Sequence, residues 1–193
     1  MKTVTKEFLQ KHDACNSGME WVIENKLIGL TPKEFIDKLM TSGKFSWANW
    51  LIVRLMNKKQ KVMYAIFAAE QVLHIFEERY KNDLRPRKAV EAAKAYLKNP
   101  SKKTKQDAYA AAHAATAAHA ATAARAAAHA ASAAAYAYAT AYAAAADAHA
   151  AAAAADAAAD AYAAAYAADA ADAYAAEKQM QITIINYGLT LIN

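Results

Sequence analysis

Apolar residues recur at helical spacing along the first half of the chain. Between residues 59 and 81, Val62, Ile66, Ala69, Val72 and Phe76 follow one another at intervals of three or four. Such intervals place the side chains on one face of an α-helix, which can then pack against a core. Similar patterns predict further helices over residues 6–14, 19–25, 31–40 and 46–56, and from 85 or 86 to about 97.

Turn and capping residues separate these expected helices. Residues 16–18, Asn-Ser-Gly, form a cluster that is typical of a turn. Thr31 is suited to cap the next helix, Pro32 fits the first helical position, and Glu34 completes a capping box. These signals predict where the helix at 31–40 begins.

Alanine dominates the second half of the chain. Of the 71 residues from 106 to 176, 48 are alanine and none is glycine or proline. Because alanine has the highest helix propensity, we expect this segment to be helical, opening after Pro100 with Ser101 or Thr104 as its cap. A single helix of this length would be unusual, so breaks are expected near residues 119–124 and 147–156.

The sequence predicts an all-α fold, a single-domain multi-helix bundle with long alanine-rich helices. Residues 1–100 form a basic, aromatic-rich half, residues 101–180 the alanine-rich helices, and residues 181–193 an apolar tail expected to pack back onto the first half. Residues 1–105 hold 21 Lys and Arg against 11 Asp and Glu, a net charge of +10. Residues 106–193 hold 2 against 7, a net charge of −5, so the two halves should attract each other.

No membrane span, metal site or catalytic constellation is recognisable in the sequence. The longest alanine run, Ala150–Ala155, is flanked by Asp147 and Asp156, so we expect no membrane helix. Cys15 is the only cysteine, which excludes an intramolecular disulfide and favours a cytoplasmic location. Histidines at metal-ligand spacing and a nucleophile beside a base are both lacking, so we expect no metal, no cofactor and no enzymatic activity. The lysines are scattered without interleaved arginine and aromatic residues, so nucleic acid is not an expected partner.

Residues 72–101 carry a resemblance that composition does not explain. They contain a Phe-Glu helix end, a short acidic link, Arg85-Pro86-Arg87 and the helix sequence AVEAAKAY, followed by alanine helices studded with histidine and arginine. Together with FLQKHDAC at 8–15 and WANWLIVRL at 47–55, this order resembles the alanine-rich immunity protein family of bacterial polymorphic-toxin systems, which also occurs in phages and mobile elements. The chain departs from that pattern at Tyr96, where tryptophan is common. The resemblance implies a non-enzymatic protein that neutralises a toxin or effector by binding it.

Arg85 and Arg87 are the first candidate binding residues. Asp83 is suited to cap the helix that follows, and two guanidinium groups at a helix N-terminus combine with free backbone N–H groups into an anion site. The alternative is a structural role, in which the arginines form ion pairs with acidic residues such as Glu77 or Glu91.

A second candidate set lies in the alanine-rich segment. At 100° per residue, Arg125, His129 and Tyr136 share one face of a helix, and Glu91 is a candidate partner for either arginine set. They suggest an alternative function, a phage-type counter-defence protein that sequesters an anionic, nucleotide-like small molecule in a pocket lined by Arg, His and Tyr. A protein partner would need an exposed acidic or apolar patch, whereas a small anion would need an enclosed polar pocket. The oligomeric state stays open, a homo-oligomer included.

Overall fold

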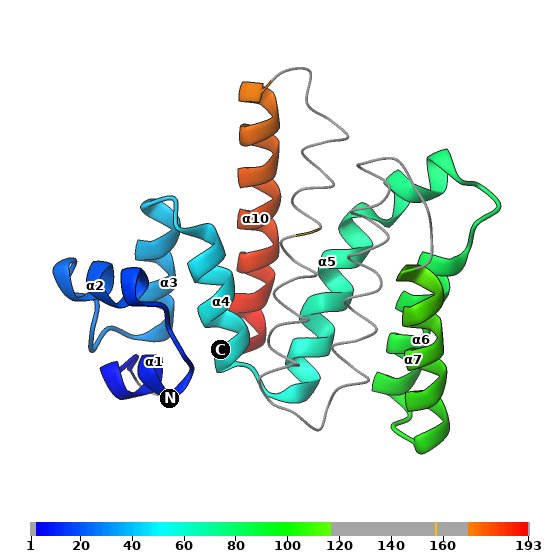
Figure 1. The fold of residues 1–193 in the computed structure, drawn as a ribbon, viewed down its shortest axis with the longest axis horizontal. Coiled ribbons are helices and arrows are strands. Elements are labelled where there is room, and N and C mark those ends of the chain that lie inside the picture. The colour runs from blue at the N-terminus through cyan, green and yellow to red at the C-terminus, as the bar shows by residue number, and fades with distance from the viewer. Residues whose placement is uncertain (1–2, 117–156, 158–169, 193) are drawn as a thin grey trace.

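A computed structural model of the protein describes residues 3–116, 157 and 170–192 (Figure 1). Every regular element in these residues is an α-helix, which confirms the predicted all-α fold. No described helix combines the length and the apolar character needed to cross a membrane. The predicted breaks at 119–124 and 147–156 lie outside the described residues. The helices are α1 (Lys6–Lys11), α2 (Asn16–Glu24), α3 (Pro32–Thr41), α4 (Phe45–Leu55), α5 (Lys58–Arg79), α6 (Arg85–Lys98), α7 (Lys102–Thr116) and α10 (Ala170–Ile192).

Two helices begin with a capping box. The Thr31 hydroxyl accepts a hydrogen bond from the backbone N–H of Glu34, and the Glu34 carboxylate accepts one from the N–H of Thr31 at 3.0 Å. This confirms the predicted start of α3. Asn57 and Gln60 form the same reciprocal pair at the start of α5, which the sequence analysis did not predict. Both boxes satisfy backbone donors that have no partner within the helix.

Two predicted boundaries differ from the structure by three residues. Residues 16–18 are the first turn of α2 and not a turn between helices, because Asn and Ser are tolerated where the first backbone N–H groups lack helical partners. The first helix ends at Lys11 and not at residue 14, since Asp13 has a φ of 57°, in the left-handed region where a helix cannot continue. At the alanine segment, Ser101 is the cap: its hydroxyl accepts the Thr104 N–H at 3.1 Å.

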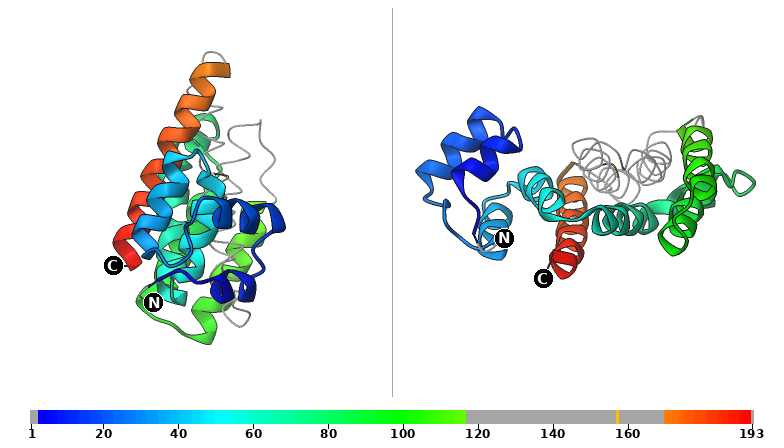
Figure 2. Two further views of the ribbon diagram at one scale, coloured as in Figure 1. Left: turned by 90° about the vertical axis from the view of Figure 1, so that its left-hand side faces the viewer. Right: turned by 90° about the horizontal axis from the view of Figure 1, so that it is seen from below.

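The last helix lies between two helices that are consecutive in the sequence. α10 packs against both α4 and α5, so the C-terminal segment runs between them (Figure 1). On one side, α4 packs against α3; on the other, α5 packs against α6 and α6 against α7. The right-hand view in Figure 2 shows the same row of α4, α10 and α5, with α1, α2 and α3 at one end and α6 and α7 at the other.

Close packing at Gly188 brings α10 onto its neighbours. A Cβ atom at this position would lie 2.7 Å from both Ile52 Cδ1 of α4 and Tyr64 Cε2 of α5, closer than side chains tolerate. Ile52 and Tyr64 are fully buried, and the Tyr64 hydroxyl donates to Asn49 Oδ1 at 2.9 Å. Beside them, Tyr187 of α10 stacks on the ring of Phe67 with a centroid distance of 4.0 Å. The apolar tail expected from the sequence is therefore the end of α10, held in the centre of the structure.

Replacing Gly188 by alanine should destabilise the protein. Alanine normally stabilises a helix interior by about 1 kcal/mol relative to glycine. Here the added methyl group overpacks the contact with Ile52 and Tyr64, and such overpacking typically costs about 1–3 kcal/mol. We expect a net loss of up to about 2 kcal/mol in the free energy of unfolding, measured by urea denaturation.

Asn186→Ala supplies the control, because Asn186 is exposed on the same helix. Its effect should stay within about 0.5 kcal/mol of the wild type. A gain in stability for Gly188→Ala would show that α10 does not approach α4 and α5 this closely.

Candidate functional site

The helices α5 and α6 form an antiparallel pair joined by two ion pairs. Arg87 binds Glu77 in a bidentate arrangement, with Nε and Nη2 each 2.5 Å from a carboxylate oxygen, and Lys94 pairs with Glu70. The partners are seven residues apart on both helices, which is two turns, so both pairs lie along the same seam. The bond to Glu77 is also the main reason why the pKa of Arg87 is raised. These two ion pairs fix the position of the corner between the two helices, which is formed by residues 80–84.

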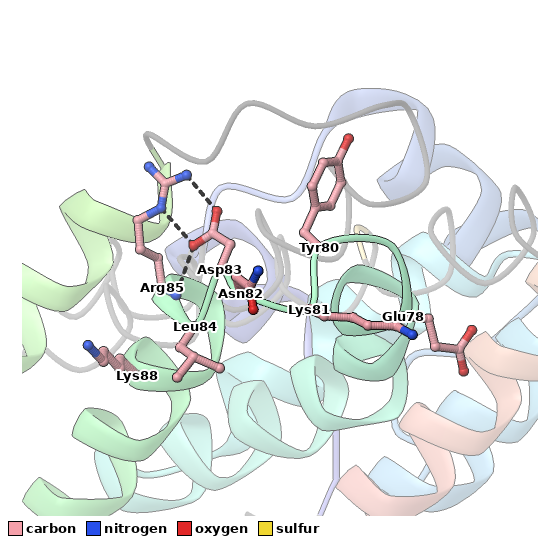
Figure 3. Close-up of a pocket in the computed structure, with 8 residues that line it drawn as sticks. All are labelled: Glu78, Tyr80, Lys81, Asn82, Asp83, Leu84, Arg85 and Lys88. Atoms are coloured by element: carbon pink, nitrogen blue, oxygen red, sulfur yellow. Dashed lines mark hydrogen bonds and ion pairs between the residues drawn. The ribbon is translucent and has the colours of Figure 1, made fainter.

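The corner itself is shaped by Asp83 and Arg85. The Asp83 carboxylate accepts the backbone N–H of Arg85 at 3.1 Å, Nε at 2.8 Å and Nη2 at 2.6 Å (Figure 3). It thus satisfies a free donor in the first turn of α6 and neutralises the guanidinium group at the same time. The pKa of Asp83 is lowered, mainly by the side-chain hydrogen bonds from Arg85.

A hollow of about 830 Å³ lies at this corner and is open to solvent. It is lined by residues 78, 80–85 and 88. Leu84 is 48% exposed although it is apolar, and Figure 3 shows its side chain directed away from the pair formed by Arg85 and Asp83. Lys81 and Lys88, both exposed, flank the hollow. The corner therefore presents one apolar side chain between two lysines.

The structure brings only part of the predicted site together. Arg85 lines the hollow, whereas Arg87 lies outside it on the seam with α5. Glu91 is exposed one turn beyond Arg87 and contributes to the raised pKa of that arginine through its charge. The remaining predicted residues, Arg125, His129 and Tyr136, lie outside the described part of the chain.

A second concavity, which the sequence analysis did not predict, lies at the other end of the structure. It is a pocket of about 320 Å³ where α1, α2, α3 and α4 meet, and its walls are mainly apolar. Trp47 and Trp50 of α4 form part of the wall, while Asp13, Cys15 and Ser46, all exposed, supply its polar groups. The three-residue spacing of the tryptophans, which places both on one side of α4, is the only signal in the sequence that could have indicated it.

Cationic side chains cover the rings near this pocket. The Lys44 ammonium lies 4.8 Å from the centre of the Trp47 ring, and the Arg54 guanidinium lies 4.0 Å from that of Trp50. Trp21 meets Trp47 edge to face at 5.8 Å. These contacts hold the two wall tryptophans in place.

Within residues 3–116, 157 and 170–192, no group of three or more His, Cys, Asp or Glu side chains is arranged to hold a metal ion.

Comparisons with protein-family models, with curated proteins and with solved structures found no match. The two concavities and the charges around them are the features of the described residues that bear on function.

The Arg87–Glu77 ion pair should contribute measurably to stability. A double-mutant cycle with Arg87→Ala and Glu77→Ala is expected to give a coupling free energy of about 0.5–1 kcal/mol, because the pair is bidentate but partly exposed. The coupling should fall in 1 M NaCl, where the Debye length is about 3 Å. The exposed pair Lys33–Asp37 within α3 is the reference, with an expected coupling of about 0.3–0.5 kcal/mol. Zero coupling at low salt would contradict a structural role for Arg87.

Acid should destabilise the fold through His12. Its ring lies 4.5 Å from that of Phe8, and burial, together with the positive charges of Arg54, Lys11 and Lys61, lowers the pKa of His12 despite the opposing charge of Asp13. The folded state thus binds the proton less readily than the unfolded state, whose histidine pKa is about 6.5. The contribution of neutral His12 to stability is therefore fully present above about pH 6.5. It is lost as the pH falls toward the lower pKa of the folded state.

Urea denaturation at pH 7.5 and 5.5 measures this effect. The loss of unfolding free energy on acidification should be smaller in His12→Gln than in the wild type. An equal loss in both proteins would assign the acid sensitivity to other groups.

Proposed function

We propose that the chain is a non-enzymatic binding protein that neutralises a toxin or effector protein by docking the α5–α6 corner onto an acidic surface of that protein. The observation that carries the proposal is the exposed Leu84 in an open hollow between Lys81 and Lys88. A central apolar side chain with a charged rim is a common composition of a protein-binding surface, and the rim here holds Lys81 and Lys88 together with the exposed Glu78.

The pairing of the arginines favours this proposal over the sequestration of a small anion. Arg85 is neutralised by Asp83 and Arg87 by Glu77, so an anionic ligand would have to displace a carboxylate from each guanidinium group. The hollow is also open, whereas pockets for small ligands usually bury most of the ligand surface. A protruding side chain of a protein partner fits an open hollow without being enclosed by it.

The net charge of the first half favours association with an acidic partner. Residues 1–105 carry a net charge of +10, from 21 basic and 11 acidic residues, so this half attracts acidic surfaces over a distance. Lys81 and Lys88 add positive charge at the corner itself. Because the two ion pairs between α5 and α6 hold the corner in position, little ordering is required when the partner binds.

Photo-crosslinking in cells of the source organism tests the proposal. A photoreactive phenylalanine in place of Leu84 should crosslink one acidic protein, identified by mass spectrometry. The double variant Lys81→Glu/Lys88→Glu should reduce its affinity for the purified chain by about tenfold or more, since two attractive charges become repulsive. Co-expression of the chain should relieve the growth arrest that this partner causes.

The same photoreactive residue at Ile23, an exposed apolar position on α2, is the matched control and should not crosslink that protein. Crosslinking that is equal from both positions would contradict the proposal, as would growth arrest that the chain does not relieve. An anionic small molecule that is present in the native mass of the purified protein and released on denaturation would instead support sequestration.

A further inference from the structure

The apolar pocket between α1, α2, α3 and α4 has the dimensions of a small-molecule site. Its volume of about 320 Å³ lies at the lower end of the range of ligand pockets, roughly 300–1,000 Å³. An engineered apolar cavity of about 150 Å³ is known to hold one benzene molecule. The pocket is roughly twice that size, so it has room for two fused rings, about ten non-hydrogen atoms.

The walls favour a flat, apolar occupant. Trp47 and Trp50 of α4 provide aromatic surface, and the buried side chains of Phe35 and Leu39 from α3 add further apolar surface. Aromatic rings pack against such walls in stacked or edge-to-face arrangements. Met19 of α2 adds a side chain that adapts to irregular shapes.

The charges around the pocket do not favour an ionic ligand. Among the described residues that line the pocket, Asp13 alone is charged, and the positive charge of Arg54 acts on this carboxylate. Arg54 in turn lies over the Trp50 ring and donates to the backbone carbonyl of Trp50 at 3.0 Å. Lys44 is likewise placed over Trp47. The carboxylate of Asp13 therefore has Arg54 as a nearby opposite charge, and the other described lining residues are uncharged.

We propose that this pocket binds an uncharged, apolar aromatic molecule of bicyclic size, with the polar groups of Asp13 and Ser46 at its mouth. The site is independent of the α5–α6 corner, which lies at the opposite end of the structure (Figure 2). Its test therefore succeeds or fails separately from that of the proposed function.

Cys15 offers a reporter for occupancy, since it is exposed, lines the pocket and is the only cysteine in the chain. Hydrogen bonds from the Ser17 hydroxyl and the Gly18 backbone lower the pKa of this thiol, which favours the reactive thiolate. The thiolate attacks a mixed disulfide of naphthylethanethiol and 2-mercaptoethanol. A new disulfide forms between Cys15 and the naphthylethyl sulfur, the reagent disulfide breaks, and 2-mercaptoethanol leaves as its thiolate.

The protein is equilibrated with this reagent, bis(2-hydroxyethyl) disulfide and excess 2-mercaptoethanol. The amounts of the two Cys15 adducts are then measured by mass spectrometry of the intact protein. The naphthyl adduct should exceed the hydroxyethyl adduct by about tenfold or more, because only the naphthyl group gains from leaving water. Ser46→Phe fills the mouth and should remove this preference. Ser42→Phe, at an exposed position outside the pocket, should retain it.

A measurement without the thiol completes the test. In Cys15→Ser, naphthalene should raise the melting temperature, and the rise should disappear when Ser46→Phe is added. Circular dichroism checks whether Ser46→Phe is folded. If it is not, Ala14→Leu replaces it, because this change narrows the same pocket from the link between α1 and α2. Equal labelling by the two disulfides would overturn the proposal, as would a naphthyl preference that neither pocket variant reduces or a melting temperature that naphthalene does not change.

Discussion

The contact of Gly188 with Ile52 and Tyr64 is the constraint on which the rest of the structure depends. It allows α10 to lie between α4 and α5, so that the end of the chain joins two helices from its first half. Ile184 and Ile185, both 1% exposed, add large apolar side chains to the same layer. Because alanine contributes little apolar area per residue, a chain with so much alanine needs such a layer of larger side chains.

The two candidate sites depend on this central layer in different ways. α5 extends from the layer to the corner, and its pairs with α6 through Glu70 and Glu77 fix how the corner is presented. α4 extends to the opposite end, where Trp47 and Trp50 form part of the apolar pocket. One end thus combines lysines with an exposed leucine, and the other end holds a pocket with mainly apolar walls. The proposed partners follow this difference: an acidic protein for the corner and an uncharged aromatic molecule for the pocket.

Local signals in the sequence were sufficient to predict the helices but insufficient to predict the sites. The capping box at Thr31 is predictable because its residues are neighbours in the chain, and Asn57 and Gln60 carry the same local signal. The turn predicted at residues 16–18 is wrong because Asn, Ser and Gly occur both in turns and in the first turn of a helix. The carboxylate partner of Arg87 could be named only as one of several, since the choice of Glu77 depends on the register between α5 and α6. The pocket depends on four helices meeting, which no short pattern encodes.

Hydrogen exchange of the backbone amides tests the role of the central layer most directly. If α10 is an integral part of that layer, the amides of residues 184–189 should open only in global unfolding, with the same free energy as those of residues 48–53 in α4 and 62–69 in α5. All three segments should then respond equally to low concentrations of urea. Rapid exchange in residues 184–189, while α4 and α5 stay protected, would show that α10 is dispensable and would contradict this account.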